Sequence, residues 1–308
     1  MELSIEVIAS LPNVLVRTGL SAWVAEHLDA TPEDRAALAA RLQGVIDAAS
    51  DAEIDQLRDT FTRAGDDWRL HLADPLAQRI TRTYMSAVVS PWAIEGREHL
   101  ESFLASPARR RMVVCNHLSY TDTQVTDVVL SLAGLDGVAG RLVAIAGPKV
   151  YTDPWRRMAS IALNTRKTAQ SSTVASEQDA LTSRELAAVA LETLAECGRL
   201  MDEGYIVLLY PEGTRARERR LQPFLRAAAR YLLIEGVEVL PLGQVGGERI
   251  FPVDATIMYR EPATLVFGEA FTPREHGAKT AALAECHRRL ALLLPETHQP
   301  VEGAARVT

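Results

Sequence analysis

Apolar residues recur at helical spacing through about the first ninety positions of the chain. After Thr31, the side chains of Leu38, Leu42, Val45 and Ile46 repeat every three to four residues, which is typical of an amphipathic helix. Comparable spacing predicts further helices over about 11–27, from residues 50–51 onward, and over about 70–88. Short helices in close succession favour a small bundle. We therefore expect an N-terminal helical bundle over residues 1–89.

After Pro91 the pattern changes to short apolar runs that alternate with helical stretches. The runs predict strands at about 112–115, 142–146, 161–163, 205–210, 237–242, 255–259 and 264–267. A capping box at Thr182 and Glu185 predicts a helix to about residue 203, and two more are expected at about 223–235 and 278–294. Pro241, inside one run, indicates an edge strand or a bulge. Residues 90–308 are thus predicted to form an α/β domain with a mixed sheet flanked by helices.

Composition is that of an ordinary globular protein, with 47% hydrophobic and 24% charged residues in 308. The formal net charge of −7 argues against a basic nucleic-acid binder. Three cysteines without a C-x-x-C pair suggest a reduced, intracellular protein. The chain contains no run of 18 apolar residues, and no basic signal-peptide region begins it. We expect a cytoplasmic protein, and a peripheral contact at the inner membrane surface stays open.

The first candidate chemistry is a His–Asp pair. His117 and Asp122 lie five positions apart, directly after the predicted strand at 112–115. Five steps on a regular helix would set them about 140° apart, so they meet only if His117 is in a turn and Asp122 opens the next helix. Asp122 would then hold Nδ1–H, leaving Nε2 to take a proton from a substrate hydroxyl. A chance pairing without chemistry is the alternative.

The second candidate is the sequence Pro-Glu-Gly-Thr-Arg-Ala-Arg, which begins after the predicted strand at 205–210. Gly213 permits a tight turn, and a buried Glu212 would accept a hydrogen bond from a substrate hydroxyl. Arg215 and Arg217 are alternate residues, so in an extended segment they point the same way and suit a phosphate. The alternative is a surface turn with solvated arginines.

A third basic group, Arg166 and Lys167, follows the predicted strand at 161–163. At a strand end both side chains can reach a shared pocket, although an exposed basic turn fits as well. Motifs for metals and organic cofactors are absent: we find no H-E-x-x-H, no paired-cysteine site and no phosphate-binding P-loop. We expect no metal and no cofactor.

The order of four blocks, NHLSYTD, NTRK, YPEGTRAR and VLPL, resembles the glycerol-3-phosphate and lysophosphatidate acyltransferase family over about residues 90–270. The stretch AGPKVYTDPWRRMASIALNTRKT is most similar to the soluble plastid glycerol-3-phosphate acyltransferases, which also carry an N-terminal helical bundle. The resemblance implies His117 as general base and Asp122 as its partner. It also implies Arg166, Lys167, Arg215 and Arg217 as phosphate ligands, with Glu212 and Gly213 lining the acceptor site.

The expected reaction is therefore transfer of a fatty acyl group from acyl-CoA or acyl carrier protein to a hydroxyl of glycerol 3-phosphate. These substrates are the expected partners, and nucleic acid is not. One alternative is a lysophosphatidate or other lysophospholipid acyltransferase, which would need an apolar entrance near the N-terminal helices. A thioester hydrolase, with water as acceptor, is a second alternative, and a non-catalytic acyl-binding protein is a third.

Overall fold

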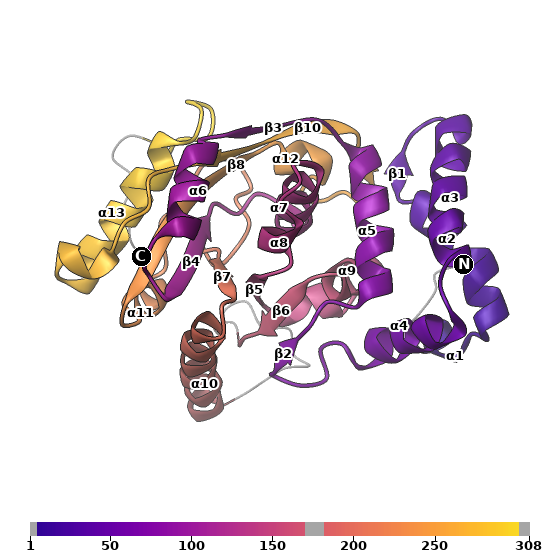
Figure 1. The fold of residues 1–308 in the computed structure, drawn as a ribbon, viewed down its shortest axis with the longest axis horizontal. Helices are drawn as coiled ribbons and strands as arrows, with labels where there is room; N and C mark the ends of the chain where they lie inside the picture. The colour runs from indigo at the N-terminus through magenta and orange to yellow at the C-terminus, as the bar shows by residue number, and fades with distance from the viewer. Residues whose placement is uncertain (1–4, 170–181, 302–308) are drawn as a thin grey trace.

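An eight-stranded mixed sheet forms the centre of the protein, as a computed structural model that describes residues 5–169 and 182–301 shows (Figure 1). The strands lie in the order β2-β6-β5-β7-β4-β8-β10-β3. Their bounds are β2 Leu70–His71, β3 Val89–Glu95, β4 Arg110–Cys115, β5 Leu142–Ala146, β6 Asn164–Lys167, β7 Ile206–Leu209, β8 Val237–Val245 and β10 Glu261–Phe267. Strands β6, β5, β7, β4 and β8 are parallel, whereas β2 and β10 run antiparallel to their inner neighbours. This confirms the predicted mixed α/β fold.

The two faces of the sheet are covered by different helices, because side chains alternate along each strand. Met112 and Val114 of β4 pack on one face with the helices that follow residue 182, whereas Val113 and Cys115 face the other layer. The helices of the first layer are α10 Ser183–Asp202, α11 Ala229–Leu232 and α13 Lys279–Leu292. Those of the second include α5 Pro75–Val88, α6 Arg97–Ala105, α7 Asp122–Leu132 and α9 Pro154–Ile161. The central strands are therefore buried on both sides.

The N-terminal segment forms the helices that its apolar spacing predicts, α2 Asn13–Ala25, α3 Pro32–Asp47 and α4 Asp51–Arg63, followed by α5. A further short helix, α1 Ile5–Ser10, was not predicted. Thr31 caps α3 through the backbone N–H of Asp34, and Ser50 forms a complete capping box with Glu53 at the start of α4. Capping of this kind satisfies backbone donors that the first turn leaves free.

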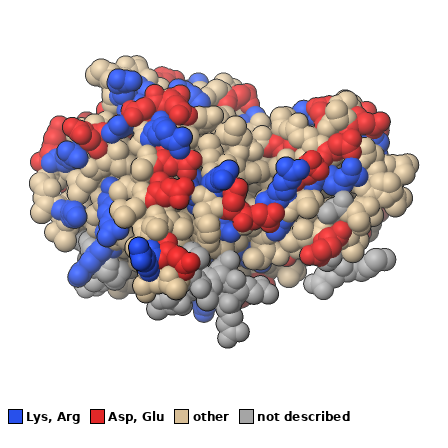
Figure 2. Space-filling view, turned by 90° about the horizontal axis from the view of Figure 1, so that it is seen from below, with Lys and Arg blue, Asp and Glu red and all other residues tan. Residues whose placement is uncertain are grey.

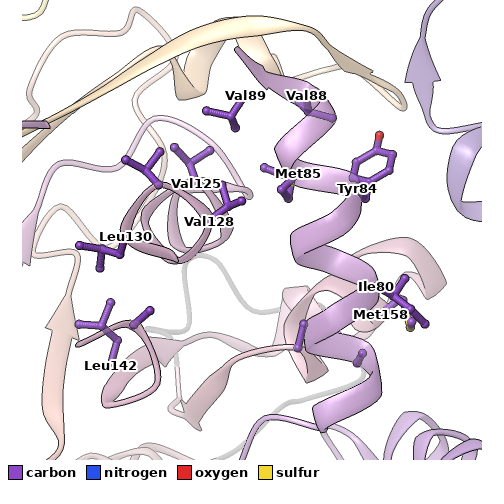
Figure 3. Close-up of a cluster of buried hydrophobic side chains, with 14 of the residues drawn as sticks. Ile80, Tyr84, Met85, Val88, Val89, Val125, Val128, Leu130, Leu142 and Met158 are labelled. Atoms are coloured by element: carbon purple, nitrogen blue, oxygen red, sulfur yellow. The ribbon is translucent and has the colours of Figure 1, made fainter. Parts of the chain in front are cut away.

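The N-terminal helices share one hydrophobic core with the second layer of the sheet. In Figure 3, Met85 of α5 faces Val125 and Val128 of α7, and Tyr84 lies on the opposite side of α5. The Tyr84 hydroxyl donates to the carbonyl of His27, beside β1 Leu28–Asp29, which pairs with β9 Met258–Tyr259. Contacts between the N-terminal helices and the rest of the chain are therefore extensive. The division into two domains at residue 89 stays a prediction.

Several predicted bounds are wrong. The helix expected over 70–88 begins at Pro75, since Leu70–His71 forms the edge strand β2. The strand expected at 161–163 lies at Asn164–Lys167, because Ile161 ends helix α9. The helix expected over 223–235 is reduced to a short 3-10 turn and one turn of α-helix.

The expectation that Pro241 marks an edge strand or bulge is also wrong. Strand β8 is internal, between β4 and β10, and Pro241 pairs with Val114 of β4. The Pro241 carbonyl accepts from Gly268 N just beyond the β8–β10 ladder, which ends at the Leu242–Phe267 pair. The nitrogen of Pro241 points to the same side of the strand as its carbonyl, past the end of the β8–β10 ladder. No ladder hydrogen bond needs an N–H at that position, so a proline is tolerated there.

Charged side chains of both signs alternate over the face shown in Figure 2. The three cysteines, Cys115, Cys197 and Cys286, are buried free thiols. Within residues 5–169 and 182–301, no helix combines the length and the apolar character needed to cross a bilayer.

Candidate functional site

His117 and Asp122 meet at the end of the central strand β4. The strand stops at Cys115, His117 lies in the following turn, and Asp122 is the first residue of α7. His117 Nδ1 lies 2.8 Å from Asp122 Oδ2. The His117 side chain is 20% exposed and that of Asp122 only 1%, so the base candidate reaches solvent while its partner is enclosed. The structure brings the pair together in the strand-turn-helix arrangement expected, and its catalytic role stays a prediction.

The Asp122 carboxylate is fixed by donors on both oxygens. Oδ2 also accepts from the backbone N–H groups of Leu118 and Ser119, at 2.6 and 2.9 Å, and Oδ1 accepts from Gln244 Nε2 at 3.3 Å. Because a carboxylate oxygen can only accept, the Asp122 carboxylate favours the His117 tautomer in which Nδ1 carries the proton. Among the described residues, His117 Nε2 has no hydrogen-bond partner, and it is the nitrogen available to a substrate.

Two residues that support Asp122 were missed from the sequence. Gln244, in the otherwise apolar strand β8, exchanges backbone and side-chain hydrogen bonds with Asn116 and donates to Asp122. Gly247 begins the short helix α12 Gly247–Ile250, and a Cβ there would lie 2.5 Å from Asp122 Oδ1. A polar residue inside an apolar strand was the available signal for Gln244. Gly247 gave no such signal, because its contact is with a distant part of the chain.

Glu212 follows strand β7, the neighbour of β4, and both of its oxygens accept from backbone N–H groups. Oε1 accepts from His117 N at 2.6 Å and Oε2 from Gln222 N at 2.7 Å. Burial raises the pKa of Glu212 to about 8, against the opposing effect of these two donors. Its carboxyl group therefore holds two loops together beneath His117, and its role in the acceptor site stays a prediction. Gly213, next to it, is exposed and has a φ of 68°, a conformation that favours glycine.

Arg215 lies next to the His117 loop. Ala216 N donates to the carbonyl of His117 at 2.7 Å, which joins the two segments through their backbones. The guanidinium carbon of Arg215 lies 3.5 Å from the centre of the Tyr120 ring, and Nη1 donates to Val253 O. Burial lowers the pKa of Arg215 from its ordinary value. Arg217 is exposed, and no contact within the described residues joins its guanidinium group to that of Arg215.

Arg166 and Lys167 lie elsewhere on the sheet. They belong to β6, three strands from β4 and therefore roughly 14 Å away at about 4.8 Å per strand. Arg166 is fully buried and forms an ion pair with Glu196 of α10, whereas Lys167 Nζ donates to Gly65 O and lies 4.3 Å from the centre of the Trp68 ring. The structure does not bring either side chain to Arg215, so the predicted shared cluster of cations is not formed by these residues.

Known proteins similar to this chain are acyltransferases. Residues 93–244 match the sequence model of the Acyltransferase family. A chloroplastic 1-acyl-sn-glycerol-3-phosphate acyltransferase of Brassica napus is 36% identical over 62 residues, which are 20% of this chain and 18% of that protein. A protein of the same name from Chlamydomonas reinhardtii is 31% identical over 87 residues, 28% of this chain and 26% of that protein. The chain thus matches only about a fifth to a quarter of the length of these relatives.

A solved structure, the 1-acyl-sn-glycerophosphate acyltransferase PlsC of Thermotoga maritima, aligns with a TM-score of 0.46 at 15% identity, covering 91% of this chain and 97% of that one. The match to the family model spans β4, β7 and most of β8, and with them His117, Asp122, Glu212 and Arg215. Residues 93–244 of this chain thus belong to the Acyltransferase family, and both curated relatives that match part of the chain are named 1-acyl-sn-glycerol-3-phosphate acyltransferases.

Proposed function

We propose that this protein transfers a fatty acyl group from an acyl thioester to the free hydroxyl of a 1-acylglycerol 3-phosphate. The observation that carries the proposal is the His117–Asp122 pair at 2.8 Å, with Nε2 unoccupied by any described residue and Arg215 beside the same loop. The choice of acceptor follows the names of the two curated relatives, which are both 1-acyl-sn-glycerol-3-phosphate acyltransferases.

The chemistry requires one base that also acts as an acid. His117 Nε2 takes the proton of the acceptor hydroxyl as its oxygen attacks the thioester carbonyl, and the Asp122 carboxylate stabilises the resulting imidazolium. When the tetrahedral intermediate collapses, the C–S bond breaks and the imidazolium returns its proton to the leaving thiolate. The products are an ester and a free thiol. Base catalysis of this kind contributes roughly 10²–10⁴-fold to the rate.

An apolar cavity near the N-terminal helices favours an acceptor that carries a tail. The cavity has a volume of about 110 Å³ and is lined by side chains of α1, α2 and α4 together with Met158 of α9. Leu15, one of its lining residues, is 50% exposed, so the cavity opens at the surface. Helix α9 is tied to α7, which carries Asp122, by the hydrogen bond from Gln124 Nε2 to Ala159 O. A hydrocarbon chain bound there would lose water-exposed apolar surface.

The acceptor is tested by side-by-side turnover assays of the purified protein with 1-acylglycerol 3-phosphate and with glycerol 3-phosphate, each with acyl-CoA and with acyl carrier protein. We expect ester formation with the acylated acceptor at the higher kcat/KM. Faster turnover of glycerol 3-phosphate would refute the choice of acceptor. Thiol release that does not depend on acceptor would indicate a hydrolase instead, and acyl-CoA binding without turnover would indicate a non-catalytic protein.

The base is tested by His117→Ala. We expect the rate of acyl transfer to fall roughly 10²–10⁴-fold with the circular dichroism spectrum unchanged. Arg97→Ala, on the exposed start of α6, is the matched control and should transfer acyl groups at the wild-type rate. A folded His117→Ala variant with near wild-type turnover would end the assignment.

We further propose that α1 and α2 contact the membrane that supplies the acceptor. Val7, Val14 and Leu15 are 41%, 64% and 50% exposed on these helices. Exposed apolar side chains on adjacent helices favour a lipid surface. Sedimentation with phosphatidylglycerol vesicles should recover the wild-type protein but not a Val14→Asp, Leu15→Asp variant, and equal recovery of both would refute the contact.

A further inference from the structure

A second arginine, Arg156, lies against the loop that carries His117. Its guanidinium carbon is 4.8 Å from the centre of the Tyr120 ring, which also contacts Arg215 at 3.5 Å. The two guanidinium carbons are therefore no more than about 8.3 Å apart. A guanidinium group bound to a phosphate through N–H···O contacts of 2.7–2.9 Å places its carbon about 4 Å from the phosphorus. Both guanidinium groups are therefore close enough to contact the same phosphate.

The charge of this pair is only partly balanced. Within the described part of the chain, Arg215 has no ion-pair partner, and Arg156 has only Asp153, at 3.6 Å between Nε and Oδ1. That carboxylate also caps α9 by accepting from the backbone N–H of Arg156 at 2.9 Å. After burial, the nearby charge of Arg156 is a second cause that lowers the pKa of Arg215. Two half-buried like charges repel each other, and a bound dianion would remove that repulsion.

The neighbouring Arg157 has a structural role that Arg156 does not share. It is buried, and its guanidinium donates to the carbonyl oxygens of Tyr151, Phe61 and Thr62, so it joins α9 to α4. The guanidinium of Arg156 has no backbone carbonyl partner among the described residues, and the Arg156 side chain is 28% exposed. The two adjacent arginines on this helix therefore have different environments, and of the two only Arg156 has donors available beside the Tyr120 ring.

We infer that Arg156 and Arg215 together bind the phosphate of the acceptor, with the Tyr120 ring setting their spacing. The inference rests on the proposed function. A phosphate of CoA has the same chemistry, but in CoA the whole pantetheine arm separates the phosphates from the thioester. In a 1-acylglycerol 3-phosphate the attacking hydroxyl and the phosphate are on adjacent carbons. Because the arginine pair lies beside the loop that positions the base, the acceptor satisfies both contacts.

Equilibrium binding tests the inference without requiring turnover. Calorimetry with 1-hexanoylglycerol 3-phosphate should give a Kd that is roughly 10- to 100-fold higher for Arg156→Gln than for the wild type, since a charge-assisted contact is lost. Arg156→Lys should fall between them, because it keeps the charge but not the two-pronged donor. Arg97→Gln, which also removes one partner of a surface helix ion pair, is the control and should bind as the wild type does. An unchanged Kd for Arg156→Gln would overturn the inference.

Kinetics then distinguish the source of the phosphate. In Arg156→Gln, the KM for the acceptor should rise by a similar factor while kcat and the KM for acyl-CoA stay near wild type. A rise confined to the KM for acyl-CoA would overturn the acceptor assignment. If the wild type binds the lysophosphatidate but transfers no acyl group, the proposed function fails while the binding result still decides the role of Arg156.

Discussion

Glu212 makes the stability of the protein depend on pH in a direction that is opposite to that of most carboxylates. Its side chain is 3% exposed, and burial raises its pKa from 4.5 to about 8. Between these values the folded protein binds a proton that the unfolded chain does not. The free energy of unfolding therefore falls as pH rises from 4.5 to 8, and it is highest below that range. At 1.36 kcal/mol per pKa unit, the full change is roughly 5 kcal/mol.

The perturbation is Glu212→Gln, which has nearly the same shape and does not titrate. The amide differs from the protonated carboxyl group by an offset in stability that does not depend on pH, because its NH₂ group cannot accept from the backbone N–H that contacts the second oxygen of Glu212. This offset does not change the slope. His27 and His71, whose pKa values are lowered by burial, titrate in both proteins and cancel in the difference.

The assay is urea unfolding of both proteins at several pH values from 4.5 to 9. We expect the stability of wild type minus that of Glu212→Gln to decrease by roughly 5 kcal/mol over this range. A flat difference curve would refute the reasoning. It would mean that the His117 and Gln222 N–H groups stabilise the ionised carboxylate enough to offset its burial.

Three further substitutions test single contacts. Asp122→Asn should lower kcat roughly 10²–10⁴-fold in steady-state assays, because an amide orients the His117 ring less well, and an unchanged kcat would contradict this. Arg166→Met should leave the acceptor KM unchanged but cost about 3–5 kcal/mol in urea unfolding, since Glu196 loses its buried partner, and a raised KM would restore the phosphate role. Gly213→Ala should cost about 1–2 kcal/mol in thermal unfolding, because its φ is 68°, and an unchanged Tm would show that the turn adapts.

The sequence predicted most reliably those features that depend on residues close together in the chain. Thr31, Ser50 and Thr182 each precede an amphipathic segment, and each caps the helix expected there. The His117–Asp122 pair was predictable because a short buried strand, a turn and a helix leave one geometry in which the two side chains meet. Both inferences need only contacts between residues that are close in the chain.

Arg166 shows why the rest was harder to predict. The predicted strand at 161–163 placed it beyond a strand end, whereas it lies inside β6 with its side chain buried. Its partner, Glu196, is thirty positions later on α10, and nothing near Arg166 in the sequence marks that pairing. The sequence could identify Arg166 as a cation, but which residue pairs with it depends on how α10 packs against the sheet.

The backbone around His117 connects the two motifs more tightly than their separation in the chain suggests. The His117 N–H donates to Glu212 at 2.6 Å, and the His117 carbonyl accepts from Ala216 N at 2.7 Å. The loop that supplies Arg215 is therefore bonded on both sides of the residue that supplies the base. Since β4 and β7 are hydrogen-bonded neighbours, the strands fix the starting points of both loops as well. In the proposed reaction, a substrate phosphate held by Arg215 would be placed at a set distance from Nε2, and fixed spacing of this kind lowers the barrier to a reaction between bound groups.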